Sequence, residues 1–373
     1  MAWWCGFLLA PATCWVAKMR VVVAMSGGVD SSTVAGLLAE AGHEVIGVTL
    51  QLYDHGAAVG RKGACCAGQD IHDAKRVADH LGIPHYVIDA EARFRAAVMA
   101  DFADSYAAGE TPVPCVRCNQ TVKFHDLMGL ARDLGADRLA TGHYVQRIDG
   151  ADGPQLHRAA DPARDQSWFL FATTKAQLAQ TIFPLGAMAD KDAVRAEAER
   201  LGIAVAAKPD SQDLCFVPSG SYAEVVGKFR PEALQGGDIV GEDGRVLGQH
   251  DGIARYTVGQ AKRLGNAAQE NGARRVVVSL DPATRRIVVG APDRGTRQVR
   301  LREVNWLVPP ARLRCTVKLR AREAPHPAEV IPTEDGVEVI LDAPALPAPG
   351  QACVFYDGER VLGGGFIRPP VRA

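Results

Sequence analysis

The chain has 373 residues, of which 47% are hydrophobic and 23% are charged, an ordinary composition for a soluble globular protein. This length allows two or three domains and a core that needs no disulfide staples. The formal net charge of -1 excludes a strongly basic nucleic-acid-binding protein. The charge is uneven, however: residues 251–322 hold 16 Lys/Arg and 5 Asp/Glu, and the remainder holds 26 and 38. The C-terminal part is therefore predicted to face a polyanion, with a solvated basic face as the alternative.

The first 18 residues are apolar, contain Pro11 and lack the basic start of a signal peptide. They are also short for a membrane span. A strand pattern begins at once after Met19, so we interpret Met19 as the natural start and residues 1–18 as an extension outside the fold. Nine cysteines are too few for a disulfide scaffold, and their clustering favours a reducing compartment. We therefore expect a cytoplasmic protein without a membrane partner.

Strands and helices alternate from Met19 to about residue 205. Short apolar runs predict strands over 20–25, 45–50, 85–88 and 138–141. Helical patterns with stop signals such as Gly42 and Gly82 cover 31–41, 70–81, 94–107 and 122–134. The last two helices would flank a cysteine-containing loop. This alternation predicts an α/β fold with a doubly wound parallel sheet.

The pattern changes after Pro209, where glycines and short β-branched runs become frequent. The runs lie at 275–279, 287–289, 314–319 and 337–341. They predict a small mixed central domain followed by a closing C-terminal β-barrel. The expected domains are 19–210, 211–292 and 293–373.

A glycine-rich turn, AMSGGVDSS at residues 24–32, joins the first strand to the first helix. Gly27 and Gly28 lack a Cβ, so the backbone can bring its N–H groups against an anion, and the helix N-terminus favours a pyrophosphate. Asp30 cannot bind phosphate directly and is assigned to Mg²⁺ or to capping of the turn. Neither a G-x-x-x-x-G-K-[ST] nor a G-x-G-x-x-G motif is present. A tight turn without a ligand is the alternative.

Three thiols stand out: Cys115 and Cys118 in TPVPCVRCN, and Cys215 in KPDSQDLCF. Nearby positive charge from Arg117, Lys123 or Lys208 would favour the thiolate, as would a helix N-terminus after Cys118. Two thiols that meet at one site can carry and release sulfur as persulfide and disulfide. A zinc ion or an iron–sulfur cluster on Cys115, Cys118 and Cys215 is the main alternative, and inert buried thiols are the other.

The loop resembles the S-G-G-x-D-S loop of the ATP-pyrophosphatase (PP-loop) superfamily. From Met19 onward, nearly the whole chain resembles the tRNA-specific 2-thiouridylases of the MnmA/TrmU family. The motifs that carry the resemblance are AMSGGVDSS, CCAGQDIHDAKRVADHLGIPHYVID, TPVPCVRCN, LATGHYV, ARDQSWFL, FPLG, DSQDLCF, TVGQAKRLG, NWL and GQACVFYDGERVLGGG. The resemblance implies an adenine nucleotide alpha hydrolase-like PP-loop catalytic domain, a central domain with the catalytic-cysteine loop, and a tRNA-contacting barrel.

The resemblance also implies ATP-dependent 2-thiolation of the wobble uridine of tRNA, with ATP and Mg²⁺ as cofactors and a persulfide-relay protein as sulfur donor. Cys118 would be the nucleophile, and Cys215 the persulfide carrier that forms a transient disulfide with it. The implied ATP site comprises Ala24, Met25, Ser26, Gly27, Gly28, Val29, Asp30, Ser31, Leu50 and Gly142. The implied tRNA contacts are His143, Arg164, Asp165, Gln166, Arg320, Ala321 and Gln351.

The chain departs from the family pattern in several places. Cys115 stands where an Asp is familiar, which strengthens the metal-ligand alternative; Arg164 replaces a Lys, Leu50 replaces a Met, and Ala321 is smaller than usual. Plain structural roles are also open: His143 could fill a sheet edge, Trp168 and Phe169 could be core, and Arg164–Asp165 could be a surface ion pair. The alternative functions are another PP-loop adenylating synthetase, or a metal- or cluster-containing tRNA-binding protein.

Overall fold

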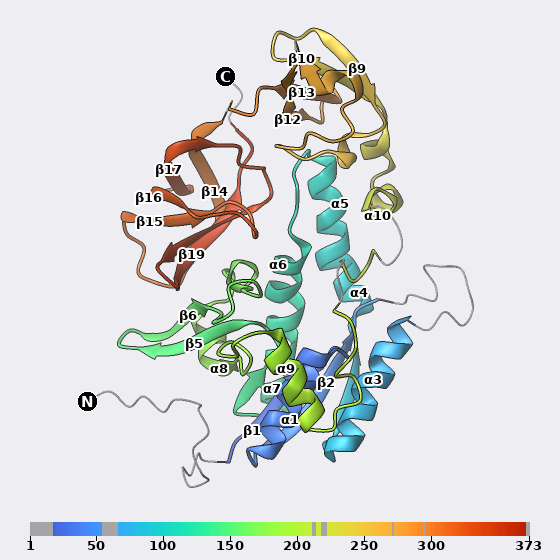
Figure 1. The fold of residues 1–373 in the computed structure, drawn as a ribbon, viewed down its shortest axis with the longest axis vertical. Coiled ribbons are helices and arrows are strands. Elements are labelled where there is room, and N and C mark those ends of the chain that lie inside the picture. Colours follow the sequence, from blue (N-terminus) through green and yellow to red (C-terminus); the bar gives the residue numbers. More distant parts are fainter. Residues whose placement is uncertain are drawn as a thin grey trace.

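The computed structural model describes residues 18–53, 66–210, 214–217, 222–270, 272–293 and 295–370. An α/β domain, a small central β domain and a β-barrel follow one another along the chain (Figure 1). The predicted N-terminal extension, apart from Lys18, lies outside the described residues. In the described part, no helix is long and apolar enough to cross a membrane.

The α/β domain is built on a parallel sheet with the strand order β3-β2-β1-β4-β7. Its strands are β1 (Arg20–Ala24), β2 (Glu44–Gln51), β3 (His85–Asp89), β4 (Arg138–Ala140) and β7 (Thr181–Ile182). Strands β2 and β3 are added on one side of β1, and β4 and β7 on the other, so the strand order switches between β1 and β4. In open α/β sheets, ligands bind at the carboxyl ends of the strands on either side of such a switch. The predicted doubly wound sheet is confirmed.

Helices cover both faces of this sheet because alternate side chains of β1 point in opposite directions. Val22 packs in one core with Leu127 of α7 (Phe124–Asp133). Val21 and Val23 pack in a second core with α1, α3 and α9. These helices span Val29–Glu40, Cys66–Leu81 and Lys191–Arg200. Because β1 is covered on both faces, its sequence is continuously apolar.

The segment around Cys118 is a helix and not the predicted loop. α6 (Pro114–Cys118), the π-helical turn η2 (Asn119–Lys123) and α7 form one continuous helical run. The neighbouring run is α4 (Glu91–Phe94), η1 (Arg95–Met99) and α5 (Ala100–Ala107), again with a π-helical turn. Pro114 occupies the first helical turn, where its missing N–H is tolerated. The π turn breaks the 3.6-residue period, which hid the first part of the helix from the sequence pattern.

The central domain contains a sheet with the order β12-β13-β8-β9, and helix α10 (Tyr222–Phe229) packs against α5. The strands span Val276–Asp281, Arg286–Gly290, Gly237–Gly241 and Val246–His250. Ile239, Val277 and Ile287 form the centre of its small core. The two runs predicted at 275–279 and 287–289 therefore lie on adjacent strands of one sheet.

The C-terminal strands form a closed barrel with the order β14-β17-β16-β15-β18-β19, which closes through β14–β19 pairing. The strands span Thr296–Trp306, Gly336–Ala345, His326–Thr333, Leu313–Lys318, Ala352–Asp357 and Arg360–Ile367. A hairpin of the α/β domain, β5 (Val145–Gly150) and β6 (Gly153–Arg158), joins the same sheet at β19. The barrel is confirmed, and its attachment to the first domain by strand pairing is a feature the sequence pattern did not reveal.

Candidate active site

The glycine turn lies at the carboxyl end of β1, and helix α1 begins directly after it. Gly27 has a φ of +73°, and a Cβ at this position would lie 2.1 Å from the carbonyl oxygen of Asp70. Gly28 is the N-cap of α1 and has extended backbone angles. Only glycine suits position 27, because both the left-handed backbone and the close contact exclude a side chain. The turn therefore presents a helix N-terminus with little side-chain cover.

Serine hydroxyls and a second glycine complete this turn. The Ser26 N–H donates to the Oγ of Ser31 over 3.0 Å. The fully buried Ser32 hydroxyl has no hydrogen-bond partner in the ranges the structure describes. Gly142 follows β4, and a Cβ there would lie 3.0 Å from the Ser31 nitrogen. The structure thus brings together the loop after β1 and the loop after β4, at the two sides of the switch point.

The side chain of Lys208 bonds the backbone of the turn. Its Nζ donates to the Gly27 carbonyl oxygen at 3.0 Å and pairs with carboxylates of Asp70 and Asp73, both at 2.7 Å. Burial opposes the charged form of Lys208, but the two carboxylates outweigh it and raise the pKa of this lysine. Lys208 is therefore a fixed cation that supports the turn and is not a neighbour that activates Cys215.

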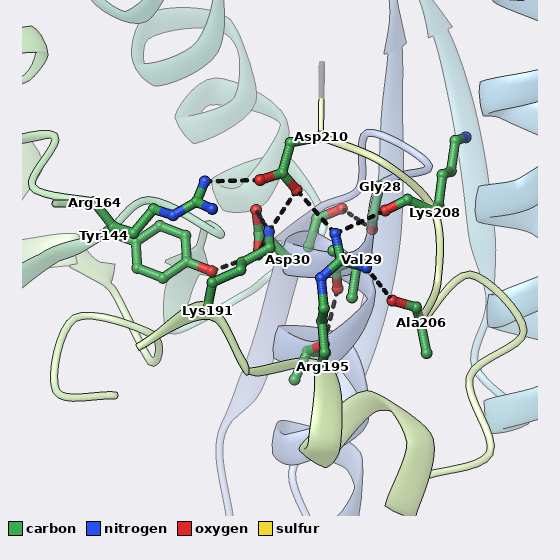
Figure 2. A network of polar contacts seen from close by, with 12 residues as sticks. Gly28, Val29, Asp30, Tyr144, Arg164, Lys191, Arg195, Ala206, Lys208 and Asp210 are labelled. Atoms are coloured by element: carbon green, nitrogen blue, oxygen red, sulfur yellow. Dashed lines mark hydrogen bonds and ion pairs between the residues drawn. The ribbon is translucent and has the colours of Figure 1, made fainter. Parts of the chain in front are cut away.

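The carboxylate of Asp30 is bonded by the side chains of Lys191 and Tyr144 (Figure 2). Lys191 Nζ lies 2.7 and 2.9 Å from its two oxygens, and the Tyr144 hydroxyl donates to Oδ1 over 2.6 Å. The N-cap residue Gly28 has no side chain to cap the helix, and the assignment of Asp30 to Mg²⁺ or to capping of the turn stays a prediction. Ligation of Mg²⁺ by Asp30 would require Lys191 to leave the carboxylate.

The thiols of Cys115, Cys118 and Cys215 are brought near one another. Cys118 packs in the same core as Phe216, and Leu50 at the end of β2 contacts that core. Cys118 is buried, whereas Cys115 and Cys215 keep accessible surface. Removal from solvent by the surrounding protein raises the pKa of Cys215 to about 12, and the charges of Cys118 and Cys115 contribute in the same direction. Burial likewise raises the pKa of Cys118 and of Cys115.

The expected thiolate activation is only partly present. Cys118 ends α6 in the middle of a helical run, so no helix N-terminus faces it. Arg117 does not serve the thiols either, since it pairs with Glu303 of the barrel at 2.5 and 2.9 Å. The positive charge of Lys123 does lower the pKa of all three thiols, but burial dominates. On balance, burial makes the three thiols less acidic than a free cysteine.

His143 lies beside this cluster. Its Nδ1 is 2.8 Å from the Thr141 hydroxyl, and its ring stacks on Phe124. Burial lowers the pKa of His143 to about 3, and the charge of Lys123 acts in the same direction. The imidazole is therefore neutral at physiological pH, and it can donate or accept a hydrogen bond but does not add positive charge.

The described residues contain no group of three His, Cys, Asp or Glu side chains placed to hold a metal ion. The three thiols influence one another electrostatically without being arranged as ligands.

Several of the side chains expected to contact tRNA instead bond within the protein. Asp165 accepts hydrogen bonds from the Ser167 N–H and hydroxyl, both at 3.0 Å, and Gln166 accepts one from the Tyr144 N–H at 2.9 Å. Gln351 donates to the Thr111 carbonyl at 3.0 Å, and Arg320 to the Val258 carbonyl at 2.9 Å. These four side chains therefore stabilise the local backbone of the expected tRNA-contacting region.

The remaining expected contacts divide into exposed and packed residues. Arg164 is partly exposed and pairs with Asp210 at 2.7 Å, not with Asp165. Ala321 packs against the large core shared by the α/β domain and the barrel. Trp168 is buried in that core with Phe169 at its edge, which agrees with the structural interpretation of these aromatic residues.

Comparison with family models identifies three domains of known kinds in this chain. The model of the "tRNA methyl transferase HUP domain" matches residues 19–219, the "tRNA methyl transferase PRC-barrel domain" matches 224–291, and the "Aminomethyltransferase beta-barrel domain" matches 296–367. These three domains in this order correspond to the α/β domain, the central domain and the barrel described above.

Curated relatives give the particular family. The chain is 70% identical over 351 residues to the tRNA-specific 2-thiouridylase MnmA of Acidiphilium cryptum (strain JF-5), covering 94% of this chain and 100% of that protein. It is 62% identical to the protein of the same name from Gluconobacter oxydans (strain 621H), covering 94% and 99%. The chain belongs to the tRNA-specific 2-thiouridylase family.

Solved structures are more distant. NMN synthetase from Francisella tularensis aligns with a TM-score of 0.34 and 17% identity, covering 58% of this chain and 79% of that one. A 4-thiouridine synthetase in complex with RNA and bound ATP aligns with a TM-score of 0.33 and 16% identity, covering 57% and 51%. At these scores, neither likeness adds to the functional argument.

Proposed function

We propose that the protein is a tRNA-uridine 2-sulfurtransferase that uses ATP to replace the C2 oxygen of the wobble uridine with sulfur. Family membership supports the reaction class. The observation that supports this site most directly is the glycine turn at the sheet's switch point, with Gly142 packed against it. Leu50, at the end of the neighbouring strand β2, packs against the core that contains Cys118. ATP would bind with its phosphates at the N-terminus of α1, close to residues 24–31.

The first step is activation of the uridine. The C2 oxygen attacks the α-phosphate of ATP, the bond to pyrophosphate breaks, and the base carries AMP on oxygen. This step turns a poor leaving group into a good one, and Mg²⁺ would neutralise phosphate charge when bound. The target base must leave its stack to reach the site, which costs a few kcal/mol and least in a single-stranded loop.

The second step moves sulfur. The terminal sulfur of a Cys215 persulfide attacks C2 and AMP leaves, so that the base is linked to Cys215 through a disulfide. The Cys118 thiolate then attacks the Cys215 sulfur, and the electron pair of the broken S–S bond remains on the sulfur now bound to C2. The products are 2-thiouridine and a Cys118–Cys215 disulfide, which an external dithiol reductant reduces. The sulfur of the persulfide must come from a donor protein, and reducing cytoplasmic conditions suit these steps.

The basic C-terminal half supplies a surface for tRNA. Exposed cationic side chains without a hydrogen-bond or ion-pair partner in the described ranges are Lys262, Arg263, Arg274, Arg286, Arg297, Arg300 and Arg322. Phosphate contacts from such residues position a nucleic acid without reading its sequence.

Single cysteine variants test the chemistry. Cys118→Ala and Cys215→Ala should each abolish 2-thiouridine formation, measured by mass spectrometry of digested tRNA, while tRNA-dependent pyrophosphate release continues. Cys315→Ala, on barrel strand β15 and half-buried, is the matched control and should thiolate normally. Normal thiolation by the Cys215→Ala protein would overturn the carrier role, and normal thiolation by Cys118→Ala would overturn the nucleophile role.

A cluster-dependent reaction is the competing mechanism. Cys115→Ala separates the two, because the persulfide route has no chemical step for Cys115 whereas a three-cysteine cluster needs it as a ligand. Loss of thiolation in Cys115→Ala, together with iron in the anaerobically purified wild-type protein, would favour the cluster.

A further inference from the structure

A buried lysine joins the phosphate turn to the segment that carries Cys215. Lys191 is the first residue of α9 and is 7% exposed. Its Nζ lies 2.7 Å from Oδ1 of Asp30 and 2.8 Å from Oδ1 of Asp210. Figure 2 shows the lysine between the two carboxylates, with Tyr144 on the side of Asp30 and Arg164 on the side of Asp210. Asp30 belongs to the first turn of α1, and Asp210 precedes Cys215 by five residues in the chain.

The rest of segment 206–210 is held against the same turn. Arg195, one helical turn after Lys191, donates to the carbonyl oxygens of Ala206 and Lys208 at 2.7 and 3.1 Å. Lys208 in turn donates to the Gly27 carbonyl at 3.0 Å. Segment 206–210 is therefore held by α9 through its carbonyl oxygens and by the phosphate turn through the Lys208 side chain.

The arrangement is more than a means of neutralising charge. A buried ammonium group needs only one well-placed carboxylate and further hydrogen bonds to be stable. Lys191 has two carboxylates, and they come from the two segments that the reaction must bring together. Burial opposes ionisation of Asp210, but Lys191 and Arg164 outweigh it and keep the pKa of this carboxyl below its usual range.

We propose that Lys191 is a positioning residue that sets the Cys215 segment relative to the nucleotide-binding turn, so that sulfur transfer follows adenylation before water can attack the activated base. This inference rests on the proposed function. An adenylated base is a reactive intermediate, and an enzyme that delivers its second reactant late loses the intermediate to hydrolysis.

The experiment compares two variants: Asp210→Asn cuts the bridge at the Cys215 segment, and Lys191→Met removes the bridge altogether. Asp210→Asn leaves the Lys191–Asp30 pair intact, and Lys191→Met leaves the Arg164–Asp210 pair intact. The matched control is Arg200→Met, because Arg200 pairs with Glu40 and so links the opposite ends of the same helices, α9 and α1, on an exposed surface. Each protein is assayed with tRNA, ATP and a persulfide donor for AMP formed and 2-thiouridine formed.

We expect AMP formation in Asp210→Asn and Lys191→Met to stay within about twofold of wild type, and 2-thiouridine per AMP to fall about tenfold or more, since small displacements of a reacting group have large rate effects. Arg200→Met should keep the wild-type ratio. A second measurement is the rate of Cys118–Cys215 disulfide formation under mild oxidation, with and without a non-hydrolysable ATP analogue. ATP should change this rate in wild type and not in the two bridge variants.

An unchanged ratio of product to AMP in a folded Asp210→Asn protein would overturn the inference, as would an equal loss of both activities. If Lys191→Met fails to fold, the ratio of 2-thiouridine to AMP in Asp210→Asn tests the inference by itself. Failure of the proposed function is distinguishable, because it would show as normal thiolation by Cys215→Ala, whatever the bridge variants do.

Discussion

Single residues of the site differ in how far sequence alone identifies them. Gly27 is identifiable, because the strand–turn–helix context and the glycine pair already require a left-handed backbone there. Lys191 and Asp210 are not. Nothing marks a lysine after an N-cap aspartate as part of a site, and only its approach to Asp30 in space shows the connection. Lys123 is a neighbour of Cys118 in sequence, and the structure places its charge near three thiols and His143.

Substitution of Lys123 by methionine should make the thiols less acidic. Among the described residues, no carboxylate pairs with this lysine, so its full charge acts on the cluster. Its charge lowers the pKa of Cys118 and Cys215; removing it should raise both, and the pH profile of alkylation by iodoacetamide should move to higher pH. Lys123→Arg should restore the wild-type profile. An unshifted profile in a folded Lys123→Met protein would contradict this electrostatic role.

At the scale of elements, the helical run from α6 through η2 to α7 decides the geometry of the thiols. Cys115 and Cys118 are three residues apart on α6 and so share a face. The π turn inserts an extra residue per turn, which brings Lys123, five residues beyond Cys118, toward that face. The sequence pattern predicts α7 but not α6, because Pro112 and Pro114 are typical of loops and the π turn disturbs the helical period.

Glu303 on β14 anchors this helical run to the barrel through Arg117. The Arg117 pair lowers the pKa of Glu303, so the carboxylate stabilises the fold above its unfolded pKa, and this stabilisation is lost as pH falls through the lower folded value. Glu303→Gln should therefore cost about 1 kcal/mol near neutral pH, a modest value because the side chain is 43% exposed and screened by solvent.

Urea unfolding from pH 7 downward measures this effect. The difference between wild type and Glu303→Gln should shrink as the pH falls below the ordinary pKa of a glutamate, because the wild-type carboxylate then takes up its proton at its lowered folded pKa. Glu329→Gln, which removes a barrel-surface pair with Arg312, is the control for a general decrease in charge. A difference that grows as the pH falls would contradict the assignment.

At the scale of the whole molecule, the barrel and the α/β domain form one unit. The β5–β6 hairpin pairs with β19, and Arg302 of the barrel makes a two-point contact with Glu110 after α5, at 2.6 and 2.9 Å. Phe171 and Val22 of the α/β domain share a core with Tyr356 and Val354 of the barrel. A tRNA held on the basic half would therefore be fixed relative to the catalytic turn.

Charge reversal on the basic half should weaken tRNA binding in a salt-dependent way. Arg286→Glu and Arg300→Glu should each reduce affinity and lower the slope of log affinity against log salt by about one for each phosphate that is no longer neutralised. Titrations over a range of salt concentrations measure this, with Arg132→Glu on the exposed side of α7 as the control for net charge. A slope equal to that of wild type in both variants would show that Arg286 and Arg300 do not contact tRNA phosphates.

The amino-acid sequence by itself determined the α/β class, the barrel and the phosphate turn, because strand periodicity, glycine geometry and helix signals act over a few residues. It also singled out Cys118 and Cys215 as chemically distinctive. Only the tertiary structure decided that Cys118 packs with Leu214 and Phe216 on either side of Cys215, that α6 is a helix, and that Lys191 joins Asp30 to Asp210. These contacts join segments far apart in the chain, and their charges and burial depend on packing that no local pattern records.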